Sequence, residues 1–279
     1  MDITLVGPGR AGMAVALAAH AAGHIVSGIL GSSAAATESA AAAVDATPLV
    51  AGEPLGGGDL LVIAVRDSQI REVADVLAPA SGGFGAAVHL SGLASIESLV
   101  SIEAAGPAIG SFHPLQTLPT PEVGAARLAG AWIGVTADEP LRSVLHSLAR
   151  SLDAHPFDLP DDAMALYHAG AAAAANFSLA SLTMAHDFFR SAGVPFEAAR
   201  PLVEAVVANA FELGPRAAIT GPVARGDAAT VAAQLRAVRD AEADWLGPFE
   251  ALVEVLARLV GRGVEFSELI DAIEEEPTK

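Results

Sequence analysis

Short apolar runs alternate with alanine-rich helical stretches along the first part of the chain. The run at residues 59–65 is apolar on both faces, as expected of a central parallel strand. The pattern predicts strands over residues 2–6, 24–30, 48–50, 59–65, 86–90, 107–111, 131–136 and 155–158. Helices are expected between them over residues 11–22, 34–44, 69–77 and 139–152. This alternation predicts an α/β fold with a doubly wound parallel sheet.

The strand pattern stops at Pro160, and only helical patterns follow. Helices are expected over residues 163–192, 198–212, 228–260 (one or two) and 267–276. The chain therefore divides into a sheet domain, residues 1–159, and an all-α domain, residues 160–279. Residues 163–186 carry no formal charge, but they are mostly alanine with polar residues between, so we expect a buried helix and no membrane span.

The first strand ends in a glycine-rich turn, Gly7-Pro8-Gly9-Arg10-Ala11-Gly12. Gly7 permits a tight turn, Gly9 lets a pyrophosphate approach the backbone, and Gly12 lets the helix pack on the strand. The free N–H groups of the helix would then face the phosphates. The turn predicts a dinucleotide-binding Rossmann domain; the alternative is a strand–helix turn without a ligand.

The second strand ends without the acidic residue that usually binds the ribose of NAD. Its end is Gly31-Ser32-Ser33, whose small hydroxyls and N–H groups can bind a 2′-phosphate, and Arg10 can supply positive charge. The cofactor expected is therefore NADP. Ser32 and Ser33 can also cap the next helix, and the two roles are compatible.

Composition removes several classes of function. The net charge of −18 argues against nucleic acid and anionic membranes as partners. The absence of cysteine excludes disulfides, thiolate metal sites and a cysteine nucleophile, and no metal site is expected. The first residues form a strand rather than a signal peptide, so we expect a cytoplasmic protein.

Polar residues follow several strands at the edge where α/β sheets bind ligands. Val65 ends one strand, and Ser91-Gly92 follows the next. His113, with Gln116 close behind, lies just past the strand at 107–111. His113 can donate a proton or bind substrate; alternatively it is a structural histidine that holds its loop.

The helical domain adds a second group of candidates. His168 and Asn176 would lie about 80° apart around one regular helix and about 12 Å along it, as two ends of a small cavity. His168 suits a general acid; alternatively it is a core histidine. Tyr167, the only tyrosine, is a weaker candidate whose alternative is packing. Arg225 can bind a carboxylate, or pair with Asp227 to order its loop.

Together these motifs resemble a known family. They are the glycine turn, Ser91-Gly92, the segment at 112–117, Tyr167-His168-Ala169 with Asn176, and the segment at 220–227. They are similar to the Rossmann-like NADP-dependent oxidoreductases that carry a helical C-terminal domain of unknown function. Relatives in the wider superfamily are ketopantoate reductase, pyrroline-carboxylate reductase and prephenate dehydrogenase, and the helical domain resembles that of 6-phosphogluconate dehydrogenase.

The resemblance implies an NADPH-dependent enzyme that reduces a small 2-oxo acid, with ketopantoate as the first guess, at a cleft between the domains. In that mechanism His168 or His113 donates the proton, Asn176 or Gln116 orients the carbonyl oxygen, and Arg225 binds the carboxylate. The resemblance also implies a homodimer formed through the helical domain. The alternatives are a non-catalytic dinucleotide sensor or scaffold and a prephenate-type dehydrogenase that works in the oxidative direction.

Overall fold

A computed structural model describes residues 1–275 of the chain. The chain folds as two compact units, Met1–Ala175 and a second unit that begins at Asn176, and each is described by itself. Within the described residues, no helix has the length and apolar character needed to cross a membrane.

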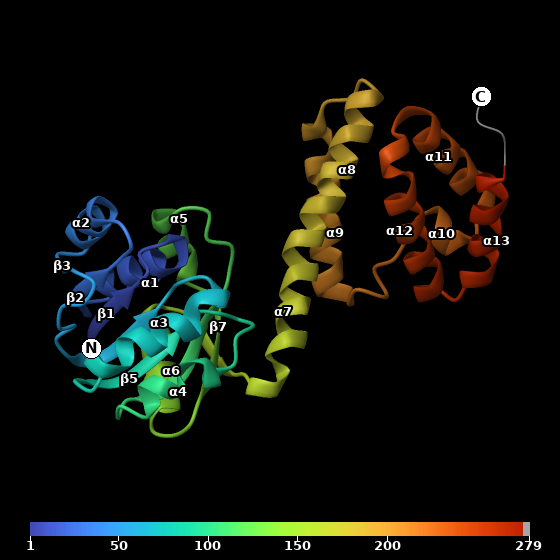
Figure 1. Ribbon diagram of the computed structural model, residues 1–279. Helices are drawn as coiled ribbons and strands as arrows, with labels where there is room; N and C mark the ends of the chain where they lie inside the picture. The colour runs from blue at the N-terminus through green and yellow to red at the C-terminus, as the bar shows by residue number, and fades with distance from the viewer. Residues whose placement is uncertain (276–279) are drawn as a thin grey trace. The chain divides into compact units, whose positions relative to one another are not determined.

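The first unit is built on one sheet, which over the described residues has eight strands (Figure 1). Its spatial order is β3 (Thr47–Leu49), β2 (Ile25–Leu30), β1 (Asp2–Val6), β4 (Gly58–Ile63), β5 (Phe84–His89), β6 (Ala108–Leu115), β7 (Trp132–Ala137) and β8 (His155–Asp158). The order reverses beside β1, where the chain passes from β3 back across to β4. Such a switch point opens a crevice at the carboxyl ends of the strands, and it confirms the predicted Rossmann-like architecture.

Helices cover both faces of this sheet. One face packs against α1 (Arg10–Ala21), α2 (Ala34–Ala42), α5 (Pro121–Leu128) and α6 (Leu141–Ser151). The other packs against α3 (Ile70–Leu77) and the short α4 (Val100–Glu103), with Ile70, Leu99 and Ile102 fully buried. The two cores explain why the apolar runs of the sequence form strands that are buried on both sides.

One detail of the predicted sheet is wrong. The strand expected to end at Ser111 continues to Leu115, so His113 lies inside β6 rather than just past it. The reason is β7, which pairs antiparallel with β6 from Gly110↔Ala137 to Leu115↔Trp132 and supplies hydrogen-bond partners for the extra residues. The sheet is therefore mostly parallel, with one antiparallel pair.

The long helix expected at residues 163–192 is also not continuous. It consists of a 3₁₀ turn (Asp161–Ala163), α7 (Met164–Ala172), a π-helical turn (Ala173–Phe177) and α8 (Ser178–Ser191). The wider π turn changes the rotation per residue. The angle of 80° between His168 and Asn176, which assumes a regular α-helix, therefore does not apply.

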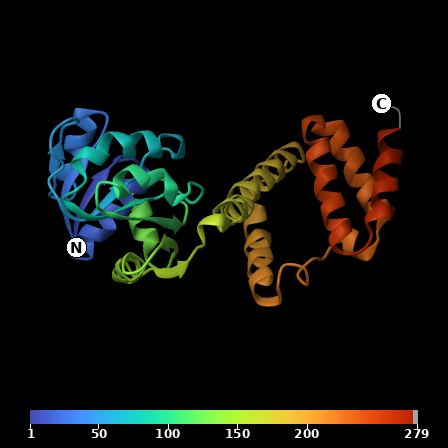
Figure 2. The ribbon, with the colours of Figure 1, turned by 60° about the horizontal axis from the view of Figure 1, so that its bottom comes forward.

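The second unit is helical throughout its described residues. After α8 come α9 (Arg200–Leu213), the single-turn α10 (Pro222–Arg225), α11 (Ala228–Ala241), α12 (Leu246–Leu259) and α13 (Gly263–Glu274). Helices α11, α12 and α13 lie side by side (Figure 2) around a small core that includes Val231, Leu235 and Phe266. Helix α9 contributes no buried residue to this core.

Candidate active site

The glycine turn has the tight geometry that its sequence predicts. Gly7 adopts φ +92°, and a Cβ atom there would lie 2.6 Å from the Ala64 carbonyl oxygen. A Cβ atom on Gly12 would overlap the Gly7 carbonyl oxygen and lie 2.8 Å from Ala64 Cβ. A Cβ atom on Gly9, by contrast, would meet nothing within 4 Å. Gly7 and Gly12 are thus required by the fold, whereas Gly9 leaves open space in front of the turn.

Helix α1 begins at this turn with its N-terminal donors uncapped by any side chain. Gly9 is the N-cap residue, and the first helical bond is donated by Met13 N–H to the Gly9 carbonyl oxygen. The N–H groups of Arg10, Ala11 and Gly12 precede that bond. An anion at the helix N-terminus would satisfy them and would also interact favourably with the helix dipole.

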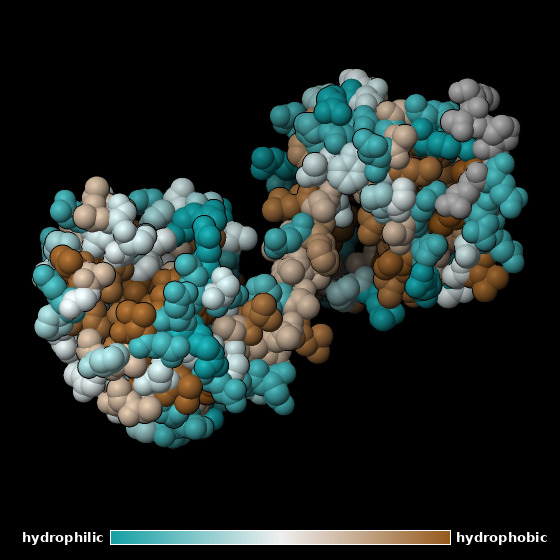
Figure 3. Space-filling view, in the orientation of Figure 1, coloured by the Kyte–Doolittle hydropathy of each residue, from teal (hydrophilic) through white to brown (hydrophobic). Residues whose placement is uncertain are grey.

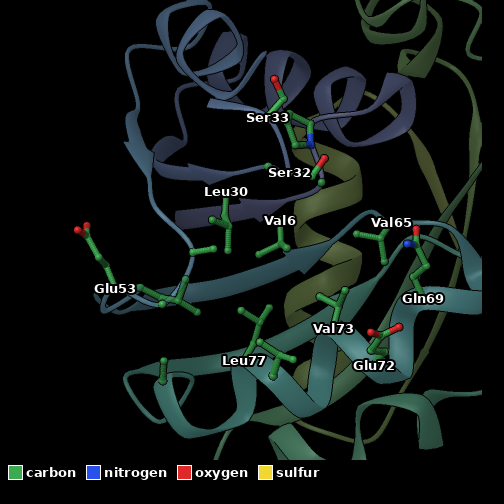
Figure 4. A pocket seen from close by; sticks show the side chains of 18 of the residues that line it. Val6, Leu30, Ser32, Ser33, Glu53, Val65, Gln69, Glu72, Val73 and Leu77 are labelled. Atoms are coloured by element: carbon green, nitrogen blue, oxygen red, sulfur yellow. The ribbon is translucent and has the colours of Figure 1, made fainter. Parts of the chain in front are cut away.

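A cavity of about 910 Å³ opens beside the turn (Figure 4). Val6 and Leu30 of the sheet face Val73 and Leu77 of α3 across it, and Ser32 and Ser33 lie at one end (Figure 4). Of the predicted cofactor residues, the lining includes Gly7, Pro8, Gly9, Ser32, Ser33 and Val65. Arg10, Ala11, Gly12, Ser91 and Gly92 are not part of it. A mostly apolar lining with a few polar groups is typical of a ligand site.

The charge of this cavity differs from the prediction. Its described lining contains two acidic side chains, Glu53 and Glu72, and no lysine or arginine. The Arg10 side chain is exposed outside the lining. A 2′-phosphate at this end would therefore depend on hydroxyl and backbone N–H donors.

The residues after β2 offer hydroxyl and N–H donors, and position 31 has no room for an acidic side chain. A Cβ atom on Gly31 would lie 2.6 Å from Thr37 Oγ1 and 2.9 Å from Pro8 Cγ, so the carboxylate of an NAD site has no room there. Ser33 is the N-cap residue of α2, as the sequence suggests, but its hydroxyl makes no capping hydrogen bond. Thr37 instead donates both its N–H and its hydroxyl to the Ser33 carbonyl oxygen. The Ser33 hydroxyl is thus available to a ligand.

A second group of polar residues gathers around His113. The Tyr167 hydroxyl lies 2.7 Å from His113 Nδ1, and the His168 ring centroid lies 6.4 Å from that of His113. The His113 ring also lies against Gly92, where a Cβ atom would be 2.7 Å from Nε2. The residues after β5, the end of β6 and helix α7 thus meet at one place within the first unit. Tyr167 therefore does more than pack against its neighbours, because its hydroxyl bonds to a candidate catalytic histidine.

Burial and charge fix the protonation of this pair. Burial, with a smaller contribution from His168, lowers the pKa of His113 to about 4. Burial also raises the pKa of Tyr167 to about 12. Near neutral pH, His113 is therefore an uncharged imidazole and Tyr167 is an intact phenol.

The neighbouring predicted residues have more local roles. Ser91 Oγ accepts hydrogen bonds from the N–H groups of Leu93 (3.1 Å) and Ala94 (2.9 Å), which fixes the loop that carries Gly92. Gln116 turns back on its own loop, where its Oε1 accepts from Thr117 N–H at 2.8 Å. The Gln116 side chain is exposed, and its amide N–H donors have no partner among the described residues.

His89 is a site residue that the sequence reasoning missed. It ends β5 with no exposed surface, and neither ring nitrogen has a well-formed hydrogen bond. Its register partner on β6 is Ser111, whose buried hydroxyl also has no hydrogen-bond partner in the part of the chain that the structure describes. Burial lowers the pKa of His89, although Asp67, Asp161 and nearby backbone groups oppose the shift. The one feature of the sequence that could have indicated it is a single histidine near the end of the apolar run 86–90.

The two remaining predicted residues belong to the second unit. Asn176 lies in the π-helical turn and is exposed. Arg225 ends the single-turn helix α10, is exposed, and forms no ion pair with a described residue. Its proposed partner Asp227 instead caps α11, accepting from Thr230 N–H at 3.1 Å and from the Thr230 hydroxyl at 2.7 Å. The π turn is a type of element that occurs frequently at functional sites.

Comparison with known domain families found one match in each part of the chain. Residues 1–114 match the Rossmann-like domain, and residues 131–254 match the domain of unknown function DUF2520. The two matches cover 114 and 124 of the 279 residues. This confirms the expected combination of a Rossmann-like domain with a helical C-terminal domain of unknown function. A search of curated proteins found no sequence match.

Several solved structures share this fold. A candidate NADP oxidoreductase from Bacteroides fragilis is 20% identical, with a TM-score of 0.78 over 92% of this chain and 98% of the other. A protein from Thermotoga maritima is 20% identical, with a TM-score of 0.70 over 93% and 98%. A reductive aminase from Aspergillus terreus, in complex with NADPH and ethyl levulinate, is 21% identical, with a TM-score of 0.66 over 97% and 98%.

Proposed function

We propose that this protein is an NADPH-dependent oxidoreductase that reduces a small carbonyl compound, with a 2-oxo acid such as ketopantoate as the first substrate to test. The observation that carries the proposal is the His113–Tyr167 hydrogen bond, which lies against Gly92 in the same unit as the glycine-turn cavity. The oxidoreductases of similar fold, among them the complex with NADPH, support the same class of reaction.

The chain's own residues fit the cofactor at two points. The pyrophosphate would bind the uncapped N-terminus of α1, where Gly9 leaves space. The 2′-phosphate would bind the Ser32 and Ser33 hydroxyls and the N-terminus of α2, which no side chain caps. Gly31 and its neighbours exclude the acid that would favour NAD. When bound, NADPH supplies the hydride.

The protonation of the pair assigns a role to His113. A phenol is a better donor than acceptor, so we infer that Tyr167 donates to Nδ1. The single proton of the neutral imidazole must then lie on Nε2. His113 would therefore act as a neutral hydrogen-bond donor that polarises a carbonyl oxygen, rather than as the group that loses a proton.

The proton itself would come from His168. It is half-buried close to His113, and histidine is the side chain best suited to exchange protons near neutral pH. For the second unit we propose that Asn176 orients the carbonyl oxygen and that the Arg225 guanidinium binds the substrate carboxylate. Gln116 is the alternative to Asn176, since its amide N–H groups have no hydrogen-bond partner among residues 1–275.

The direct test is NADPH oxidation, followed by absorbance, with ketopantoate and with NADH in parallel. Consumption that requires both protein and ketopantoate supports the reaction, the cofactor and the substrate together. A second arm adds an amine to a simple ketone, because one similar structure is a reductive aminase with cyclohexanone and allyl amine. NADPH binding without oxidation in any arm would favour a sensor, whereas NADP⁺ reduction by a prephenate-like acid would favour the oxidative direction.

We also propose that the protein forms a homodimer through its helical unit. Helix α9 has no buried residue, yet it carries Leu202, Val206, Val207, Phe211 and Leu213, all more than half exposed. Helix α7, which belongs to the first unit, also has an apolar surface (Figure 3), with Leu166 81% exposed. Several large apolar side chains exposed on one helix are typical of a subunit interface.

A further inference from the structure

The loop after β5 is held at both of its ends. At its start, Ser91 Oγ accepts from two backbone N–H groups and fixes Gly92 against the His113 ring. At its end, the Ser95 hydroxyl donates to Asp161 Oδ2 at 2.6 Å, and Ile96 N–H donates to Asp161 Oδ1 at 2.9 Å. Both oxygens of one carboxylate thus bind adjacent residues of the loop.

Asp161 lies in the 3₁₀ turn that leads directly into α7. Six residues later, in α7, the Tyr167 hydroxyl lies 2.7 Å from His113 Nδ1. The polypeptide of 161–167 therefore contacts the site twice, once at the end of the 91–96 loop and once at the end of β6. The contacts thus form a closed circuit: the Asp161 carboxylate holds the end of the 91–96 loop, Gly92 of that loop lies against the His113 imidazole, and His113 bonds to Tyr167.

We propose that Asp161 is a positioning residue for the reduction, and the proposal rests on the function proposed above. It fixes the 91–96 loop to the start of α7, so that Gly92, His113 and Tyr167 keep the spacing needed for hydrogen bonding to substrate. It touches neither substrate nor cofactor. Because the carboxylate is half-buried and both oxygens accept charge-assisted bonds, its loss would free the loop rather than remove a surface charge.

Asp162 provides a matched control. It is the adjacent carboxylate in the same turn, it is exposed, and it has no hydrogen bond or ion pair with a described residue. Asp161→Ala and Asp162→Ala remove the same charge from the same turn. Asp161→Asn retains an oxygen for Ile96 N–H and an amide that can donate to Ser95 Oγ.

The chain's only tyrosine gives a second, activity-independent signal. Tyrosine labelled with ¹³C at Cζ alone yields a single NMR resonance from Tyr167, and this carbon bears the hydroxyl that bonds to His113. Steady-state kinetics and NADPH titration would be measured on the same variants.

We expect Asp161→Ala to lower kcat at least tenfold, because small displacements of reacting groups carry effects of this size. NADPH affinity should stay within about twofold, since the glycine turn is unchanged. The Tyr167 resonance should move or double. Asp161→Asn should recover most of kcat and the wild-type resonance, and Asp162→Ala should match the wild type in every measurement.

The proposal is overturned if Asp161→Ala behaves like Asp162→Ala, or if kcat and NADPH affinity fall together. Should Asp161→Ala not fold, Ser95→Ala breaks the same contact from the loop side and should give a smaller change in the same direction. If the wild type oxidises no NADPH, the proposed function fails, but the Tyr167 resonance still decides whether Asp161 holds the site.

Discussion

Helices α1 and α9 differ sharply in what they bury, although both are rich in alanine, valine and leucine. Six of the twelve residues of α1 are buried, and none of the fourteen residues of α9 is. Helix α1 lies on a sheet that is folded within the same unit, whereas α9 has only its helical neighbours. A similar sequence pattern thus produces a complete core in one place and an uncovered apolar surface in the other. In the homodimer proposed above, a second copy of the chain would cover this surface.

The largest effect should come from filling the contact between α1 and the sheet. Gly12→Val would overlap the Gly7 backbone, so we expect a loss of about 3 kcal/mol or more in the free energy of unfolding, measured by urea denaturation. Gly9→Ala is the matched control, because a methyl group there meets nothing. It should fold normally but weaken NADPH binding at least tenfold. Equal stabilities for the two variants would contradict this assignment.

Charged substitutions on α9 test whether its exposed apolar surface is a subunit interface. Val206→Lys with Phe211→Lys should weaken self-association at least about a hundredfold, since both side chains are more than half exposed in the single chain. Analytical ultracentrifugation would measure the dissociation constant. Ile25→Lys, at an equally exposed apolar position of the sheet unit, is the control and should leave it unchanged. A wild-type monomer at all concentrations would refute the dimer.

A smaller effect is expected at the end of β2. Ser33→Asp should weaken NADPH binding about tenfold or more by repulsion of the 2′-phosphate, while NADH binding changes little. Fluorescence titration with both cofactors measures the ratio of the NADPH and NADH dissociation constants. Ser39→Asp adds the same charge to the same helix, outside the cavity lining, and should leave the ratio near the wild-type value. A parallel loss for NADH would mean that Ser33 does not contact the 2′-phosphate.

The smallest effect is confined to alkaline pH. Tyr167 should ionise near pH 12 in the folded protein, against about 10 in the unfolded chain. Its contribution to stability is therefore present below about pH 10 and is lost as pH rises toward 12, because only the unfolded state ionises in that window. Tyrosinate absorbance would follow this one residue. Tyr167→Phe should remove the part of the alkaline loss of stability that comes from this hydroxyl. Ionisation of Tyr167 near pH 10 in the folded protein would argue against its burial.

The glycine turn could be predicted because its requirements are local. Gly7, Gly9 and Gly12 are set by a strand, a turn and a helix that are adjacent in sequence, and the structure retains the geometry predicted for this turn. The strand ends were less predictable: β6 extends to Leu115 only because β7, about twenty residues later, pairs with it. The π turn at Ala173–Phe177 likewise leaves no clear mark in an alanine-rich sequence.

The group of polar residues around His113 was likewise predictable only in part. His113, His168 and Tyr167 were visible as polar residues in apolar surroundings, but their spacing in sequence does not reveal the 2.7 Å bond between Nδ1 and the phenol. The sequence does not mark His89 or Asp161 as site residues, because His89 lies within an apolar strand and Asp161 has the pattern of an ordinary helix start. Their surroundings come from segments that are distant in the chain.

The sequence by itself determined the order of strands and helices, the tight glycine-rich turn and the absence of an acid after β2, because each follows from neighbouring residues and the period of the pattern. Only the tertiary structure decided which side chains meet, which of them are neutral, and which apolar helix face stays uncovered. Those properties depend on burial and on contacts between residues far apart in sequence, such as His113 with Tyr167 and Ser95 with Asp161.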